Sequence, residues 1–149
     1  MKVALGCDQG GFALKEAVLR ALDELKVEHK DFGCFSEEPV DYPDIAGEVA
    51  RAVASGEYDR GILMCGTGIG MSIAANKVKG IRAAHCEEVV SARLSRAHNN
   101  ANVLTLGGRI LGPELAAAIV KEWIQTEFDR GGRHSRRVNK IARLESGEV

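Results

Sequence analysis

Residues 61–70 read GILMCGTGIG, and this stretch decides the fold class of the chain. The apolar run from Gly61 to Met64 is typical of a strand that is buried on both faces of a parallel sheet. Glycines alternate with other residues directly after it, and a helical pattern follows through residues 72–77. A buried strand that passes through a glycine-rich turn into a helix is the repeating unit of an α/β protein.

The alternation of strand and helix continues on both sides of this stretch. Further strands are predicted at residues 3–5, 27–32, 81–86 and 103–106, and further helices at 13–26, from 41–44 onward, at 87–97 and from 112–113 onward. We therefore predict a Rossmann-like three-layer α/β/α sandwich with a five-stranded parallel sheet and right-handed crossovers. The order of the strands does not follow from the sequence. A basic loop that starts at Arg130 leads into a short extra C-terminal helix, which we expect to dock on the core or on another subunit.

Length and charge exclude several classes of protein. A chain of 149 residues fits one domain, residues 1–149. The 20 Lys and Arg balance 21 Asp and Glu, which disfavours binding to nucleic acid or to a membrane surface. No apolar run approaches the roughly 20 residues of a membrane span. The N-terminus has no signal-peptide pattern, so we expect a cytoplasmic protein. The unusual figure is 17 glycines against 3 prolines.

The four cysteines are widely spaced and form no C-x-x-C pair, so the sequence predicts neither a disulfide framework nor a zinc site. We interpret Cys7, Cys34 and Cys86 as small buried apolar residues. Cys65 differs because it ends a strand and directly precedes the glycine turn. Amides at the start of a helix favour a thiolate, which can act as a base or nucleophile, with Thr67 as a hydroxyl partner. The alternative for Cys65 is core packing alone.

Eight glycines fall just past the predicted ends of three strands, where parallel sheets bind ligands. They are Gly6, Gly10, Gly11, Gly66, Gly68, Gly70, Gly107 and Gly108. One interpretation is that short turns need positive φ angles. The other, which three clusters on one side favour, is backbone that approaches a small anionic ligand.

The two standard phosphate motifs are absent from the sequence. GTGIG is not the dinucleotide pattern G-x-G-x-x-G, and G-x-x-x-x-G-K-[ST] does not occur, so nucleotide cofactors are disfavoured. The backbone amides of residues 66–70 can still form a nest at a helix start. Such a nest binds an anion, including one that develops during a reaction.

Charged and polar residues near these turns complete a candidate site. Asp8 can orient a sugar hydroxyl or cap the following helix. His98 is either a solvated side chain or a proton donor that works near neutral pH. Arg133 and Arg137 suit a single phosphate because arginine binds phosphate bidentately, and Arg109 is a further candidate. Arg136 is interpreted as a solvated side chain of the basic C-terminus.

Five segments together resemble one known family. They are GCDQGGFALK, DYPD, ILMCGTGIGMSIAANKVKGIRA, SRAHNNANVLTLGGR and GGRHSRRV. They resemble the ribose-5-phosphate isomerase B family, which also includes galactose-6-phosphate isomerase subunits and other aldose–ketose phosphate isomerases. The resemblance runs nearly end to end, and the long motif after residue 65 makes it specific.

The resemblance implies an isomerase without metal or cofactor that interconverts ribose 5-phosphate and ribulose 5-phosphate through an enediolate. It also implies a homodimer or dimer of dimers with the active site between two subunits. By motif, Cys65 resembles the base and His98 the ring-opening acid, helped by Thr67 and Asp8. The further substrate contacts implied are Gly66, Thr67, Gly68, Ile69 and Gly70 for the enediolate, Asn99 for hydroxyls, Arg133 and Arg137 for phosphate, and Arg109 and Gln9 in the pocket.

Gln9 is the departure from the family pattern, because members commonly carry histidine at this position. Glutamine can donate a hydrogen bond but cannot carry charge. Isomerisation of another sugar phosphate, such as an allose, galactose or tetrose phosphate, therefore stays open. A non-catalytic sugar-phosphate binding subunit is a third possibility. Retention of both Cys65 and His98 weighs against it, because binding alone needs neither.

Overall fold

The structure is a computed structural model and describes residues 1–148. Its elements are β1 (Lys2–Cys7), α1 (Phe12–Glu24), β2 (Glu28–Asp31), α2 (Tyr42–Ala54), β3 (Arg60–Cys65), α3 (Ile69–Ala75), β4 (Ala83–His85), α4 (Val89–Asn99), β5 (Val103–Gly107), α5 (Pro113–Gln125) and α6 (Gly132–Ser146). All strand pairs are parallel, in the order β2-β1-β3-β5-β4. The predicted α/β class and five-stranded parallel sheet are confirmed.

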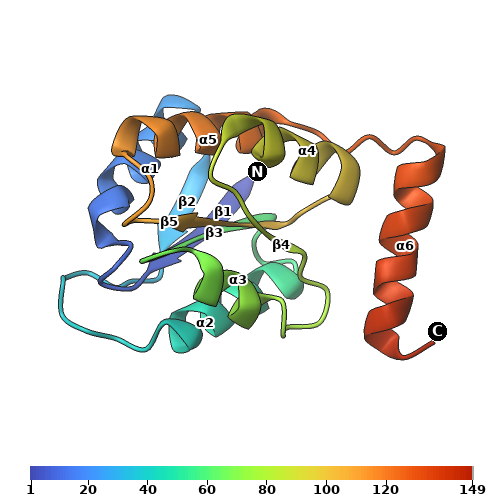
Figure 1. Ribbon diagram of the computed structural model, residues 1–149, viewed down its shortest axis with the longest axis horizontal. Helices are drawn as coiled ribbons and strands as arrows, with labels where there is room; N and C mark the ends of the chain where they lie inside the picture. The colour runs from blue at the N-terminus through green and yellow to red at the C-terminus, as the bar shows by residue number, and fades with distance from the viewer. Residues whose placement is uncertain (149) are drawn as a thin grey trace.

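Helices cover both faces of the sheet (Figure 1). Strand residues alternate between the faces. Ile62 and Met64 belong to the core beneath α1, α4 and α5, together with the fully buried Trp123. Leu63 and Cys65 point to the other side, into the core formed with α2 and α3. The predicted three-layer sandwich is therefore present, and Cys65 lies on its α2–α3 side.

The helix starts use different local signals. Pro113 lies in the first turn of α5, where its missing N–H costs nothing. At the start of α4 the Glu88 carboxylate accepts the backbone N–H groups of Val90 and Ser91. The Ser91 side chain, these backbone bonds and the nearby Arg93 lower the pKa of Glu88.

The C-terminal segment differs from the prediction. The expected basic loop and short helix form one helix, α6, of 15 residues that begins at Gly132 and includes Arg133 and Arg137. After Gly132 the segment has no glycine or proline until Gly147, so nothing interrupts the helix. α6 stands beside the body of the molecule (Figure 1), and of its described residues only His134 is buried. Of the two expected docking surfaces, the chain's own core contacts α6 at His134 and near Glu145, which accepts the Gly80 N–H at 2.9 Å, and docking on another subunit stays a prediction.

Candidate active site

A pocket of about 460 Å³ opens at the carboxyl ends of β1 and β3. It brings together predicted site residues from three separate loops. The lining residues are Asp8, Tyr42, Cys65, Gly66, Thr67, Ile69, Gly70, Ile73 and Arg109. This position, beyond the strand ends of an open parallel sheet, is the usual ligand site of such folds.

Cys65 lies at the base of this pocket, with 5% of its surface exposed. The backbone N–H of Gly68 donates to its Sγ atom at 3.1 Å. Gly68 has φ of +79° and precedes α3, so its amide belongs to the turn that starts the helix. A side chain here would also place its Cβ atom 2.6 Å from Nδ1 of His85. Only glycine fits, and the resulting amide stabilises negative charge on the sulfur.

Asp8 has a structural contact as well as a place in the pocket. Its Oδ1 atom accepts the backbone N–H groups of Gly10 at 2.8 Å and Gly11 at 3.1 Å. The carboxylate therefore orders the turn before α1, but it does not form the expected helix cap, because the N-cap is Gly11 and has no side-chain cap bond. The residue is 6% exposed and also lines the pocket beside Cys65.

The glycines serve mainly to let the loops approach one another. A Cβ atom on Gly11 would lie 2.4 Å from the carbonyl oxygen of Met64, and one on Gly108 would lie 2.2 Å from that of Gly10. Of the eight glycines at the strand ends, only Gly68 has positive φ. The interpretation that these turns need positive φ therefore applies to Gly68 alone, and the approach of all three clusters to a ligand stays a prediction. Among these eight, Gly66 and Gly70 line the pocket.

His98, Asn99, Arg133 and Arg137 do not line the Cys65 pocket. The register of β3 and β5 explains why these residues are absent from the pocket. Gly61, near the start of β3, pairs with Val103 at the start of β5, and Cys65 at the end of β3 pairs with Gly107. α4 leads into the start of β5, so His98 lies near the opposite end of the sheet from Cys65. The four strand steps from residue 61 to residue 65 alone span about 13 Å. Within one chain, the predicted base and the predicted acid are therefore far apart.

His98 instead contacts the start of α6. Its ring stacks on that of His134, with centroids 4.3 Å apart and planes 6° from parallel. Burial lowers the pKa of His134, and the neighbouring His98 and Arg133 lower it further. Arg96 stabilises the same region, because its guanidinium group donates hydrogen bonds to the carbonyl oxygens of Thr126 and Ala101.

Gln9 lies outside the set of pocket-lining residues. Its Oε1 atom accepts the backbone N–H of Val40 at 3.0 Å and so holds the segment that leads into α2. Tyr42, at the start of α2, was not predicted, although the quoted DYPD segment contains it. Its ring borders Gly70, where a Cβ atom would lie 2.8 Å from the ring. Ile73 was also missed, since an exposed isoleucine on a helix carries no signal in the sequence.

The other three thiols lie in the core, as the packing interpretation predicts. Burial raises the pKa of Cys7 to about 12, and burial also raises that of Cys86. Cys7 and Cys34 lie with their Sγ atoms 3.8 Å apart. A raised pKa keeps the Cys7 and Cys86 thiols protonated and unreactive.

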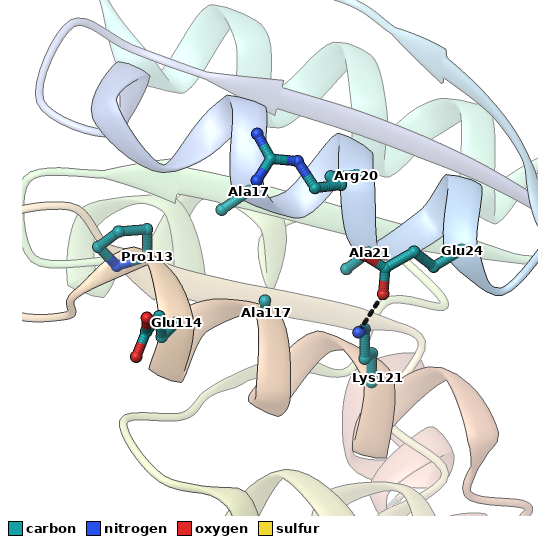
Figure 2. Close-up of a pocket in the computed structure, with 8 residues that line it drawn as sticks. All are labelled: Ala17, Arg20, Ala21, Glu24, Pro113, Glu114, Ala117 and Lys121. Carbon is teal, nitrogen blue, oxygen red and sulfur yellow. Dashed lines mark hydrogen bonds and ion pairs between the residues drawn. The ribbon is translucent and has the colours of Figure 1, made fainter.

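A second pocket, of about 360 Å³, lies between α1 and α5. Figure 2 shows its small lining residues, Ala17, Ala21 and Ala117, and the ion pair between Lys121 and Glu24 at one side. It contains no thiol, histidine or predicted site residue. Within residues 1–148, no group of three His, Cys, Asp or Glu residues could hold a metal ion, and no helix is long and apolar enough to cross a membrane.

Comparison with known proteins gives consistent matches over the whole chain. The family described as Ribose/Galactose Isomerase matches residues 3–141. Ribose-5-phosphate isomerase B of Escherichia coli is 53% identical over 97% of this chain and 96% of its own length. The D-erythrulose-4-phosphate isomerase of Pectobacterium atrosepticum is 43% identical over 99% of this chain and 97% of its own length. The structure of ribose-5-phosphate isomerase B from Clostridium thermocellum superposes with a TM-score of 0.95, at 52% identity, over 100% of both chains.

Proposed function

The chain belongs to the ribose/galactose isomerase family, and from this membership we propose that it interconverts D-ribose 5-phosphate and D-ribulose 5-phosphate. The observation that carries the proposal is the environment of Cys65. Its sulfur lies at the base of a pocket and receives the amide of Gly68 from a helix start. This arrangement supplies a base and an anion-stabilising amide without a metal or a cofactor.

The reaction moves one proton between two adjacent carbons. The Cys65 thiolate removes the proton from C2 of the open-chain aldose, and the electron pair moves through the C1–C2 bond onto the carbonyl oxygen. Amides of residues 66–70 stabilise the resulting enediolate. The thiol then returns the proton to C1 while the hydroxyl proton of O2 passes to O1. This leaves the carbonyl at C2, gives the ketose and regenerates the thiolate. No electron leaves the substrate, so no redox cofactor is needed.

The acid and the phosphate ligands come from a partner subunit in this proposal. One chain contributes Asp8, Cys65, Thr67 and Arg109, while the partner contributes the ring-opening acid. The partner groups are His98, Asn99, Arg133 and Arg137. The proposed assembly is a cytoplasmic homodimer or dimer of dimers.

Two observations support this division of the site. In one chain His98 lies at the opposite end of the sheet from Cys65. In addition, apolar side chains are uncovered on both surfaces that would meet. Ile69 and Ile73 beside the pocket are 52% and 59% exposed, and Leu144 on α6 is 66% exposed. Exposed apolar side chains that gather beside a site are typical of a protein interface.

Gln9 favours a second candidate, a tetrose 4-phosphate as substrate. One of the relatives described above is a D-erythrulose-4-phosphate isomerase. The Gln9 carboxamide is uncharged and is held by Val40, so it cannot add a positive charge to a phosphate site. A substrate of different length would then place its phosphate differently. The reaction type is the same for both candidates.

A panel of phosphorylated sugars tests the proposal. The purified protein is assayed for aldose–ketose conversion of ribose 5-phosphate, erythrose 4-phosphate, allose 6-phosphate and galactose 6-phosphate. We expect the highest kcat/KM with ribose 5-phosphate. A higher value with the tetrose would favour the second candidate. Binding of these sugars by calorimetry without any turnover would refute the enzyme and support a binding subunit.

A further inference from the structure

The stacked pair of His98 and His134 is a direct contact between α4 and the first turn of α6. The two imidazole planes are nearly parallel at a centroid distance of 4.3 Å, so His134 covers one face of the His98 ring. His98 is half-buried, whereas His134 is 7% exposed. A half-buried ring with one face covered by a fixed plane loses most of its freedom to rotate.

The surroundings of His134 hold it in place. Its backbone N–H donates to the carbonyl oxygen of Gly131, and its Nε2 atom lies 3.8 Å from Oδ2 of Asp129. Asp129 also accepts the Gly131 N–H at 2.9 Å, and its own N–H donates to the carbonyl oxygen of Ala97 at 2.9 Å. Asp129 therefore joins the last turn of α4 to the turn that begins α6, around the histidine pair.

The same contact fixes the position of two arginines. Arg133 directly precedes His134, and Arg137 follows it by three residues, about one helical turn. His134 is the buried residue among the α6 residues that the structure describes, so its ring is the side chain by which this turn packs against the body. Displacement of the ring would move both guanidinium groups along with His98.

We propose that His134 is a positioning residue that holds the His98 ring and, through the first turn of α6, the phosphate-binding pair Arg133 and Arg137. The inference rests on the proposed function, which assigns His98 as the ring-opening acid. His134 does not touch substrate in this assignment. It acts by keeping the acid and the phosphate ligands at a fixed separation.

The titratable and charged groups that face His134 are Asp129, His98, Arg133 and Arg137. Burial and three of these four groups lower its pKa, so the ring is neutral near pH 7. A neutral aromatic ring of similar size should therefore replace it, whereas a small side chain should not. This gives a matched pair of variants, His134→Phe and His134→Ala.

The test measures kinetics and the His98 signals in both variants, on the assembled protein. In His134→Ala we expect kcat to fall and KM for ribose 5-phosphate to rise, with kcat/KM lower by about 10²-fold, as for a misplaced catalytic group. In His134→Phe both constants should return to near the wild-type values. In the NMR spectrum, the stacked ring should shift the carbon-bound protons of His98 upfield in the wild type and in His134→Phe, and not in His134→Ala.

Wild-type kcat and KM in His134→Ala would overturn the inference. So would a folded His134→Phe protein as impaired as His134→Ala. If circular dichroism shows that His134→Ala is unfolded, the wild type and His134→Phe are compared instead. A missing upfield shift of the His98 protons in these two proteins would overturn the inference. Full activity in His98→Asn would instead refute the acid assigned under the proposed function, and the ring-shift result would stand independently of that failure.

Discussion

Cys65 differs from the other thiols in its position at a pocket and in one backbone contact. Cys7 and Cys86 are enclosed by the core, and burial raises their pKa values. Cys65 is also nearly enclosed, but its sulfur accepts the Gly68 N–H and borders a pocket. That N–H points at the sulfur because Gly68 adopts positive φ. Residue type alone does not separate these cysteines, whereas their position relative to a strand end and a helix start does.

Replacement of Cys65 by alanine tests the base. We expect kcat for ribose 5-phosphate to fall by at least about 10²-fold, because a positioned general base contributes roughly 10²–10⁴-fold. Substrate affinity measured by calorimetry should change little, since the base acts mainly in the transition state. Cys86→Ala, at a buried thiol away from the pocket, is the matched control and should keep kcat. Unchanged kcat in Cys65→Ala would remove this residue from the mechanism.

Replacement of Arg137 by alanine tests the phosphate site. A hydrogen bond to a charged group contributes about 1.5–3 kcal/mol, so KM for ribose 5-phosphate should rise by roughly 10- to 100-fold. Binding of free ribose should not change. Arg136→Ala is the control, because both arginines are exposed on the same turn of α6. Equal weakening for ribose with and without phosphate would contradict the assignment.

At the scale of helices and strands, local signals decide most boundaries. The apolar runs at β1, β3 and β5 were predicted correctly because those strands are buried on both faces. The error at α6 arose because a cluster of arginines was interpreted as a loop. Arginine is a good helix former, and its charge is carried at the end of a long side chain in solvent. Polarity therefore predicts exposure in this segment, but not the absence of a helix.

Glu88 provides a test of stability at the start of α4. The Ser91 side chain, together with the carboxylate's bonds to the N–H groups of Ser91 and Val90, lowers the pKa of Glu88 in the folded state. A lowered folded-state pKa stabilises the fold above the unfolded value of about 4.3, and this stabilisation is lost as pH falls through the folded-state pKa. Glu88→Ala should therefore lower Tm by a few degrees at pH 7 and by less as the pH falls toward 3.

Calorimetric melts of the wild type and Glu88→Ala at several pH values measure this difference. Glu48→Ala removes an exposed carboxylate in the interior of α2 and serves as the control for net charge. The control should show no such pH-dependent loss. A Tm difference for Glu88→Ala that grows as the pH falls would contradict the cap assignment.

At the scale of the whole molecule, sequence motifs and spatial position give different information. The motifs identified candidates for both the base and the acid of the proposed reaction. The alternation of strands and helices predicted the parallel sheet. Strand order depends on tertiary packing, and without β5 beside β3 the distance between Cys65 and His98 does not follow. The motifs also do not predict the close packing of the loops, which requires glycine at positions 11 and 108. Assembly is therefore the level at which the site must be tested.

A heterodimer of two inactive variants tests whether the site is shared. Cys65→Ala retains the acid, and His98→Asn retains the base. When one subunit of each kind is combined, one of the two sites joins the intact Cys65 to the intact His98 of the partner subunit, and the other site lacks both. Two symmetric sites therefore predict recovery of about half the wild-type activity in the purified heterodimer.

Two different affinity tags isolate the heterodimer, and each variant alone is the control. If base and acid came from the same chain, every site would lack one of them and no activity would return. A purified heterodimer without activity would therefore refute the shared site, as would a monomeric mass of the active wild type by sedimentation. Recovery can arise only if residues from opposite ends of two sheets meet, because in one chain the register of β3 and β5 keeps Cys65 and His98 apart.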